Sequence, residues 1–406
     1  MQWIWATGAL ALAVSVTFPA LGNPAPGNEA GLPRQLQTVL DGYVANRRDA
    51  EKISGAALHV SLGARKPIDV YSGTDGREGR PIDRGTLFQI GSNTKHFTAA
   101  LVLTLEAKGL LNIDQTVGDW LPQYPEWANV TIRSLLNMTG GIPNYSETVP
   151  LADAMAADMS RQFTYDELID AVHDKGLPVP TGYFYSNTNS ILAARIIEAA
   201  SHMSYRDALD AMLAPLHLRD TFYRDGPYPR QVLHRLPAGI YDNRDCTLYQ
   251  PTPCTVTAWA GLVGQDVSHM NMSWAGPTGG IVSNTQDLAK WVRALFAGHV
   301  IPRRQLDEMT SIVSTRSGRP IADVSADDPA GFGLGLGRAY RTSLGGTYWF
   351  YQGTTFGFRT VFAYWPQYSL AVTAATNSQP ADNEDQFAST VVGGAFETLQ
   401  KVGLLH

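Results

Sequence analysis

The chain has strand-like segments near both ends and helical patterns between them, and this order limits the folds open to it. Two strand candidates near the amino end, with glycine-rich turns around them, are GAALHVSLG and PIDVYSG. Four more follow one another in about the last eighty residues: GFGLGLG, GTYWFYQG, GFRTVFAYW and SLAVTAATN. The middle holds helical patterns such as SILAARIIEAASHM, YRDALDAMLAPL and NTQDLAKWVRALFAG. We therefore expect an α/β fold of the α+β type: an antiparallel sheet formed by both terminal parts, flanked by helices, with a mostly helical lobe inserted.

The size of the chain fits one domain with two lobes. Its 406 residues are 44% hydrophobic and 17% charged, which is enough apolar material for a large core. We predict a single domain at 23–406 and expect its site where the two lobes meet. The α/β lobe should take about 33–90 and 326–406, and the helical lobe about 91–325. The helices expected in the α/β lobe are 34–51 and about 385–400.

The first 22 residues have the composition of a signal peptide. They carry no charged side chain, and an apolar stretch leads to a small-residue site at Ala20-Leu21-Gly22. The usual Lys or Arg at the start is missing. A membrane anchor is the alternative, but the run is short for a span and is broken by Pro19. We predict a signal peptide at 1–22, a periplasmic or secreted protein, and no stable membrane span after cleavage.

Charge and cysteine content exclude some classes of function. The net charge is −6 and the basic residues are scattered, so nucleic acid is not an expected partner. In an exported chain, Cys246 and Cys254 most simply form one local disulfide, with two free thiols as the alternative. There is no HExxH motif and no His-x-His cluster, so we predict no metal site.

A serine and a lysine three residues apart precede the most apolar helical stretch. Ser92 and Lys95 would share one helix face, with the serine near the positive end of the helix dipole. The stretch from Phe97 to Leu105 is almost entirely apolar and predicts a buried helix. Desolvation there would lower the pKa of the lysine, so that it could take the serine's proton. The alternative is an ordinary serine N-cap followed by an ordinary charge.

A second candidate pair is Tyr185 and Asn187, in PTGYFYSNTNSILAARIIEAA. In an extended segment the phenol and the amide face the same way. The phenolate could act as a base and the amide could hold a lysine. Tyr241-Asp242-Asn243 is a rival match, and an ordinary surface loop is the third possibility. We prefer Tyr185, because a turn precedes it and an apolar helix follows it.

The third element is WFYQGTTFGFRT. It predicts an edge strand ending at Gly353, followed by a turn through Gly357 into another strand. Backbone N–H groups at such an edge could polarise a substrate carbonyl, as half of an oxyanion hole. The alternative is a plain hairpin.

These elements, in this order, resemble the serine β-lactamase and penicillin-recognising family, whose signatures are Ser-x-x-Lys, Tyr-x-Asn and Lys/His-x-Gly. The segment LLNMTGGIPNY is similar to that family's Leu-Leu-x-His-Thr-Ser-Gly-Ile-Pro segment, with Met138 and Gly140 at two of its positions. The likeness runs from about residue 35 to residue 400. It implies a β-lactamase/transpeptidase-like fold and acyl transfer through a serine ester, without metal or cofactor.

The resemblance also implies a role for each residue. Ser92 would be the acylated nucleophile, Lys95 its proton acceptor, and Tyr185 a general base and leaving-group acid. Asn187 would orient the substrate amide and Lys95. The backbone N–H groups of Ser92 and Thr354 would form the oxyanion hole. Further substrate-binding positions would be Tyr351, Gln352 and Gly353.

The third motif departs from the family pattern. Tyr351 stands where β-lactamases carry Lys and many carboxypeptidases carry His, and a neutral phenol cannot attract a substrate carboxylate in the same way. Arg359, in the next strand, is a candidate to replace that cation. An aromatic residue at this position resembles the family VIII carboxylesterases, whereas Tyr185-Ser186-Asn187 is closer to the D-alanyl-D-alanine carboxypeptidases.

The resemblance leaves two enzymatic readings. The first is a serine hydrolase of the D-alanyl-D-alanine carboxypeptidase or β-lactamase kind, acting on D-amino-acid peptides or β-lactams. The second is a carboxylesterase acting on small esters. A silent wall-binding protein is a third class, but it has no physical need for all four motif side chains. No Gly-x-Ser-x-Gly occurs, which excludes an α/β-hydrolase nucleophile elbow. We interpret His96, beside Lys95, as a structural residue.

Overall fold

The computed structural model describes residues 31–242, 261–379 and 386–405. The predicted signal peptide at 1–22 and the predicted disulfide between Cys246 and Cys254 lie outside these ranges. Within them, no helix combines the length and hydropathy needed to cross a membrane.

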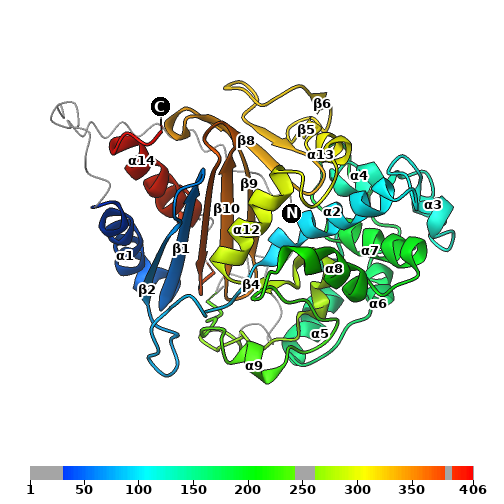
Figure 1. Ribbon diagram of the computed structural model, residues 1–406. Helices are drawn as coiled ribbons and strands as arrows, with labels where there is room; N and C mark the ends of the chain where they lie inside the picture. Colours follow the sequence, from blue (N-terminus) through cyan, green and yellow to red (C-terminus); the bar gives the residue numbers. More distant parts are fainter. Residues whose placement is uncertain (1–30, 243–260, 380–385, 406) are drawn as a thin grey trace.

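One antiparallel sheet of nine strands organises the described residues, in the order β2-β1-β11-β10-β9-β8-β7-β5-β6 (Figure 1). The first strand of the chain, β1, pairs with the last one, β11, from Ala56 opposite Thr376 to Leu62 opposite Leu370. This confirms the predicted fold class. The strands are β1 (Gly55–Leu62), β2 (Ile68–Gly73), β5 (Ile312–Ser314), β6 (Pro320–Ile321), β7 (Ala330–Phe332), β8 (Gly337–Arg341), β9 (Gly346–Thr354), β10 (Arg359–Trp365) and β11 (Leu370–Thr376).

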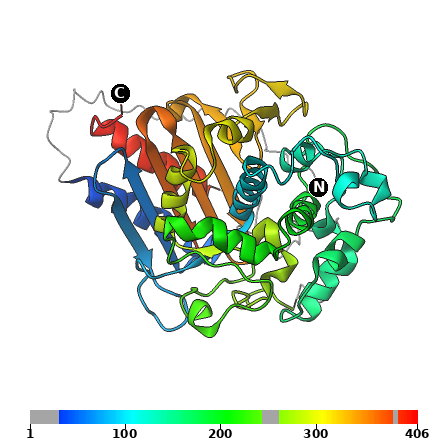
Figure 2. The ribbon, with the colours of Figure 1, turned by 45° about the vertical axis from the view of Figure 1, so that its right-hand side comes forward.

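Two predicted helices cover one face of the sheet (Figures 1 and 2). They are α1 (Leu32–Glu51) and α14 (Gly393–Lys401), the latter preceded by a π-helical turn (Ala388–Val392). Side chains of β10 alternate between the two faces, as strand geometry requires. Val361 and Trp365 join the core under α1 and α14, whereas Phe362 and Tyr364 join the core on the other side.

The helical lobe covers the opposite face. Its central helix, α2 (Thr94–Ala107), is buried along almost its whole length, as the apolar run predicts. Around it lie α7 (Thr188–Ser201), α8 (Tyr205–Leu213), α11 (Gly276–Gly279) and α13 (Arg303–Met309), whereas α12 (Thr285–Phe296) packs on β1 and β11. Further helices of the described residues are α3 (Val117–Trp120), α4 (Ile132–Leu136), α5 (Val149–Ala157), α6 (Tyr165–Asp170) and α9 (Arg230–Leu233). A small second sheet pairs β3 (Phe88–Gln89) with β4 (Val282–Ser283).

Three strand expectations need correction. The segment GFGLGLG is not one strand but the tip of the β7–β8 hairpin, since Gly335 has a φ of +72° and the N–H of Gly333 bonds the carbonyl of Leu336. Strands β5 and β6 come from the stretch assigned to the helical lobe, yet they extend the main sheet. β9, expected at an edge, lies inside the sheet between β10 and β8. Its last residues, from Tyr351 to Thr354, still run past the end of β8.

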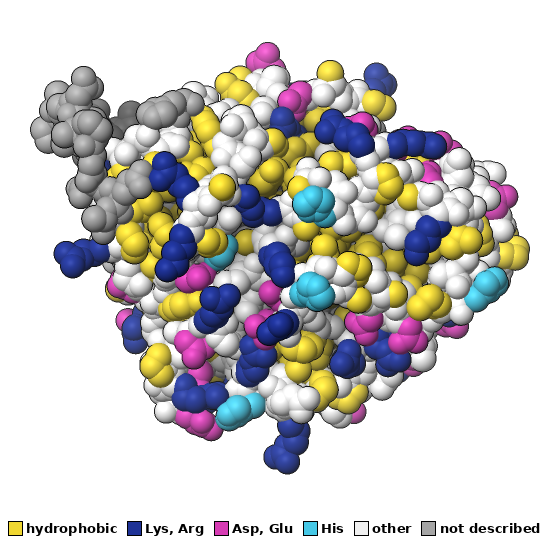
Figure 3. Space-filling model, viewed as in Figure 1, with side chains coloured by type: hydrophobic (Ala, Val, Ile, Leu, Met, Phe, Trp, Pro, Cys, Tyr) yellow, Lys and Arg dark blue, Asp and Glu magenta, His cyan; other side chains and the backbone are white. Residues whose placement is uncertain are grey.

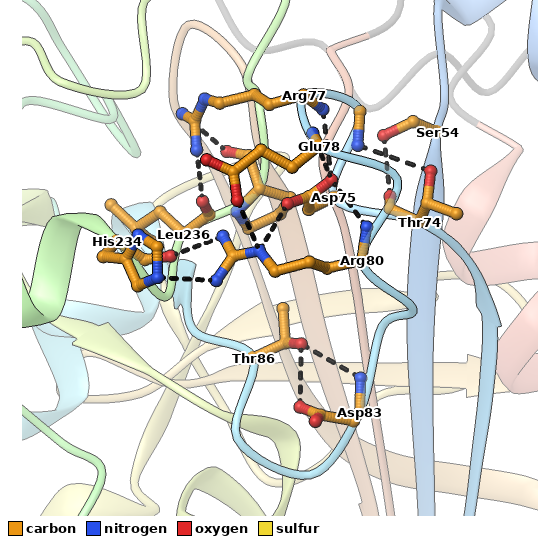
Figure 4. Close-up of polar contacts among 12 residues, drawn as sticks. Ser54, Thr74, Asp75, Arg77, Glu78, Arg80, Asp83, Thr86, His234 and Leu236 are labelled. Atoms are coloured by element: carbon orange, nitrogen blue, oxygen red, sulfur yellow. Dashed lines mark hydrogen bonds and ion pairs between the residues drawn. The ribbon is translucent and has the colours of Figure 1, made fainter.

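The loop between β2 and β3 is fixed by polar contacts (Figure 4). Asp75 accepts the backbone N–H groups of Arg77 and Arg80 and pairs with the Arg80 guanidinium at 2.8 Å. The two arginines in turn donate to the backbone carbonyls of Leu236 and His234. This loop leads directly into β3, so the strand before Ser92 starts from a fixed position.

Candidate active site

The turn that carries Ser92 lies between β3 and helix α2. This 3-10 turn, η2 (Gly91–Asn93), begins at Gly91, whose φ of +51° is in the left-handed region that glycine tolerates. A Cβ on Gly91 would lie 2.7 Å from the amide nitrogen of Thr354 in β9, closer than real Cβ atoms approach. Glycine therefore lets the turn lie directly against the sheet.

Ser92 is not a helix cap. The N-cap residue of α2 is Asn93, and the Ser92 hydroxyl oxygen instead contacts two side chains. Lys95 Nζ lies 3.2 Å from Ser92 Oγ, and the Tyr185 hydroxyl donates to the same oxygen at 2.8 Å. The structure thus brings together the serine, the lysine and the tyrosine that the sequence singled out.

Lys95 is a buried amine. Its side chain is 2% exposed, and Nζ also donates to the carbonyl oxygen of Thr278 in α11 at 2.9 Å. No acidic side chain in the described ranges pairs with it, and burial lowers the pKa of Lys95 well below its usual value because the charged form loses its hydration. A neutral amine at this position can accept the proton of the Ser92 hydroxyl.

Tyr185 is arranged as a proton donor. Burial raises the pKa of Tyr185 to about 12, although its hydrogen bonds with Ser92 and Tyr351 act in the opposite direction. The phenol is therefore protonated near neutral pH. Lys95 Nζ lies 4.8 Å from the centroid of the Tyr185 ring, where a protonated amine would be attracted to the ring face. This arrangement favours the leaving-group acid role over the general-base role.

Asn187 begins helix α7 and belongs to a polar network beside the site. Its Nδ2 donates to Ser146 Oγ at 2.9 Å, and its backbone N–H donates to Asn144 Oδ1 at 3.0 Å. Its Oδ1 is buried without a hydrogen-bond partner among the described residues, so the expected bond to Lys95 is not formed.

Sequence reasoning missed the partners of these side chains. Asn144 and Ser146 follow the LLNMTGGIP segment directly, and that segment's likeness to the family was a signal for them. The Thr278 contact is made by a backbone carbonyl, which leaves no side-chain signal in the sequence.

The rival tyrosine lies elsewhere. The backbone N–H of Tyr241 donates to the carbonyl of Gln265, and its ring packs on Phe356 with centroids 6.1 Å apart. Asn243 of the same motif lies outside the described residues. Of the two tyrosines, Tyr185 is the one bonded to Ser92.

The Tyr351 side chain lies beneath Tyr185. It is 5% exposed, and its hydroxyl donates to the Tyr185 hydroxyl at 3.4 Å. Its ring packs edge-on against Phe332 and His96. Burial raises the pKa of Tyr351 well above its usual value, so the phenol stays neutral. The phenol thus contacts a site residue, in a position shielded from solvent.

Gly353 and Thr354 lie against the nucleophile turn. A Cβ on Gly353 would lie 1.9 Å from the carbonyl oxygen of Ile90 and 2.8 Å from the amide nitrogen of Ser92. Together with the contact between Gly91 and Thr354, this places the two backbone segments predicted to supply the oxyanion hole next to each other.

Gln352 is not part of this cluster. Side chains along β9 alternate, and Trp349 and Tyr351 join the core on the helical-lobe side while Phe350 packs against the core under α1 and α14. By this alternation Gln352 has the orientation of Phe350, away from the helical-lobe side of the sheet, and its role in substrate binding stays a prediction.

Arg359 does not replace the missing cation. Its side chain is fully buried on the α1 side of the sheet, where the guanidinium forms an ion pair with Glu51 and donates from Nε to the carbonyl of Ser378 at 3.2 Å. It is therefore a structural cation rather than a substrate ligand.

His96 is also structural. Its Nδ1 accepts a hydrogen bond from Trp291 Nε1 at 2.9 Å, and its ring stacks on that of Phe97. Burial lowers the pKa of His96 to about 3, so the ring is neutral.

Charged and metal-ligating side chains are the features that would indicate other kinds of site. On the face shown in Figure 3, basic side chains are spread among acidic and hydrophobic ones. Within the described ranges, no group of three or more His, Cys, Asp or Glu side chains lies close enough to hold a metal ion.

Known proteins are similar to this chain in sequence and in fold. Residues 40–394 match the Beta-lactamase family. Penicillin-binding protein 4* of Bacillus subtilis is 30% identical over 257 residues, 60% of this chain and 52% of that protein. Esterase EstB of Burkholderia gladioli is 30% identical over 208 residues, 47% of this chain and 51% of that protein. The chain thus spans about half the length of these curated relatives.

Solved structures give a more complete match. The D-stereospecific amidohydrolase from Streptomyces sp. superposes with a TM-score of 0.69 and 26% identity, covering 89% of this chain and 98% of that one. Its fold and the curated relatives are consistent with the matched family. The chain belongs to the Beta-lactamase family, a family of serine hydrolases.

Proposed function

We propose that the protein is an exported serine hydrolase that cleaves acyl bonds through an ester on Ser92. The observation that carries this proposal is the position of the Ser92 hydroxyl, 3.2 Å from the Lys95 amine and 2.8 Å from the Tyr185 hydroxyl. A nucleophile, a desolvated base and a proton donor within hydrogen-bond reach are the groups that acyl transfer needs.

The geometry supports the following sequence of steps. Ser92 Oγ attacks the substrate carbonyl carbon while its proton passes to the neutral Lys95 amine. The backbone N–H groups of Ser92 and Thr354 stabilise the resulting oxyanion. When the bond to the leaving group breaks, Tyr185 gives its proton to the departing nitrogen or oxygen and recovers a proton from Lys95. Water then attacks the Ser92 ester and releases the acid.

The first candidate reaction is amide hydrolysis, like that of D-alanyl-D-alanine carboxypeptidases and β-lactamases. The Streptomyces relative is a D-stereospecific amidohydrolase and the Bacillus relative a penicillin-binding protein. Arg359 is paired to Glu51 and Tyr351 carries a neutral phenol, so neither residue offers a cation to a substrate carboxylate. Within this class, amides of D-amino acids therefore fit better than peptides with a free carboxyl end.

The second candidate is a carboxylesterase acting on small esters. The neutral phenol of Tyr351 favours it, because an ester carries no carboxylate that must be recognised. The Burkholderia relative EstB is an esterase by name.

Intact mass spectrometry tests these assignments. The protein is exposed briefly to penicillin, to D-phenylalanine p-nitroanilide or to p-nitrophenyl butyrate, beside a Ser92→Ala control. We expect an acyl-sized mass increment with at least one reagent, absent from the control. With the p-nitroanilide or the p-nitrophenyl ester, release of the chromophore should accompany it. An increment of equal size on the control would rule out Ser92 as the nucleophile. The reagent that acylates fastest separates the amidase from the esterase.

Export is a separate part of the proposal. It rests on the uncharged, apolar composition of residues 1–22. Amino-terminal sequencing of the protein purified from the periplasm or the medium should begin near residue 23. A chain that stays in the cytoplasm with Met1 intact would refute export without affecting the enzymatic proposal.

A further inference from the structure

We infer that Asn93 is a positioning residue that sets the spacing of the two backbone amides predicted to bind the oxyanion. This inference rests on the proposed function of Ser92. It adds to the motif residues a side chain that does not touch the reacting atoms.

The Asn93 side chain ties the nucleophile turn to the main sheet. It is fully buried, and Nδ2 donates to two carbonyl oxygens, those of Ile90 and Thr360, each at 3.0 Å. Ile90 directly precedes the turn, whereas Thr360 lies in β10 and is the register partner of Gly353 in β9. One amide group therefore joins the turn to the strand beside the one that carries Thr354.

The turn and β9 approach each other through two glycines. Gly91 and Gly353 meet backbone to backbone, and a Cβ on either residue would collide with the other segment. Asn93 Nδ2 lies 2.9 Å from the position of a Cβ on Gly353, at the inner side of the same contact. The spacing of the Ser92 and Thr354 amides thus depends on how the turn is held against β9 and β10, and Asn93 supplies that connection.

Helix capping does not account for this residue. Asn93 stands at the N-cap of α2, yet its side chain makes no capping hydrogen bond. Its Oδ1 has no hydrogen-bond partner among the described residues. The hydrogen bonds of the side chain are therefore the two that Nδ2 donates. A short side chain with two N–H donors is needed to reach both carbonyls, and aspartate, which has the same size, lacks them.

Two variants, Asn93→Ala and Asn93→Asp, test the inference in the full-length protein. We expect kcat to fall about 10- to 100-fold with KM changed by less than about threefold, because a misplaced amide weakens oxyanion binding and leaves ground-state binding unaltered. The affinity for phenylboronic acid, whose serine adduct is tetrahedral, should fall in proportion to kcat/KM. Asn93→Asp keeps the size of the side chain and serves if Asn93→Ala does not fold.

The matched control is Asn271→Ala. Asn271 is another buried asparagine that joins two segments, with Nδ2 on the carbonyl of Ser160 at 3.2 Å and Oδ1 accepting the N–H of Ser273 at 3.0 Å. Its loss should lower the thermal midpoint but leave kcat and boronate affinity unchanged. Wild-type kcat and boronate affinity in the Asn93 variants, with Ser92→Ala inactive, would overturn the role of Asn93 and leave the proposed function intact. Full activity of Ser92→Ala would instead overturn the proposed function.

Discussion

Two buried basic side chains lie on opposite sides of the sheet, and they have different partners. Lys95, on the helical-lobe side, is 2% exposed and contacts a carbonyl and a hydroxyl. Arg359, on the α1 side, is 0% exposed and forms an ion pair with Glu51. A buried amine without a carboxylate lowers its pKa and gives up its proton, whereas a guanidinium stays charged in proteins and must be paired. Burial therefore leaves the Lys95 amine neutral and able to act as a base. The Arg359 guanidinium stays charged and pairs with Glu51.

Lys95→Met should separate reactivity from stability most strongly. Methionine fills similar apolar space without a base, so we expect the acylation rate to fall by about 10³-fold or more. The free energy of unfolding should stay the same or rise, because the buried amine is no longer desolvated. Stopped-flow acylation and urea unfolding measure the two quantities. A loss of stability comparable to that caused by breaking the Arg359 pair would contradict the comparison.

Glu51→Leu should produce the opposite pattern. It leaves the Arg359 guanidinium buried without its carboxylate, so the free energy of unfolding should fall by about 3–5 kcal/mol. The protein that remains folded should keep its kcat, since Glu51 contacts no site residue. Urea unfolding with activity per folded molecule checks both statements. The double variant Glu51→Leu/Arg359→Leu should recover part of the loss, and a loss equal to that of Glu51→Leu alone would contradict a role in pairing.

Tyr185→Phe tests whether the reaction needs a proton donor as well as the Lys95 base. The variant loses the 2.8 Å bond to Ser92 Oγ, and we expect kcat to fall about 10²-fold, the usual effect of losing a general acid. The loss should be smaller for p-nitrophenyl esters than for amides, because nitrophenolate leaves without protonation. Equal losses on both substrates would show that Tyr185 does not act as the leaving-group acid.

The pH dependence of the free energy of unfolding and of the acylation rate distinguishes Lys95 from Arg359. Between the lowered pKa of folded Lys95 and its unfolded value, the unfolded chain binds a proton that the folded chain does not. The free energy of unfolding should therefore rise with pH in that window, by at most about 1.4 kcal/mol per pH unit, and level off above about pH 10.5. The acylation rate should rise with pH as the amine loses its proton. Lys95→Met should lack this contribution to the slope, whereas Glu51→Leu should keep it.

Tyr351→Phe should have the smallest effect. It removes one hydrogen bond of 3.4 Å to Tyr185 and keeps the packing against Phe332 and His96. Because that bond lowers the pKa of Tyr185, its loss should shift the alkaline limb of the pH–rate profile to higher pH. The value of kcat should change only about two- to fivefold. A large loss of kcat would mean that Tyr351 is needed for the reaction itself.

Local sequence patterns predicted the main architecture and the cluster around Ser92. The positions of the strands indicated a sheet shared by both ends of the chain, and the apolar run after Lys95 indicated its burial. Each strand and the buried helix is a local pattern, where periodicity is informative. The family resemblance, rather than a local pattern, indicated that Tyr185 acts together with Ser92 and Lys95.

What the sequence left open depends on contacts between distant segments. Arg359 is 308 residues away from Glu51, so no local pattern indicated that its charge was already used. The interior position of β9 follows from its pairing with the short strand β8, which no sequence pattern indicated, and the orientation of Gln352 follows from the sheet register. Asparagine is a residue type common at helix N-caps. The bond from Asn93 to Thr360 is evident only in the structure.

The pairing of β1 with β11 also has a consequence for biosynthesis. Ala56 lies opposite Thr376, so the sheet stays incomplete until almost the whole chain has left the ribosome. Contacts between such distant residues close late and slow the search for the native state. The helices can form earlier, but the turn bearing the nucleophile has no β9 and β10 to lie against. The nucleophile turn can therefore take its final position only after the residues of β9 and β10, 346–365, have been synthesised.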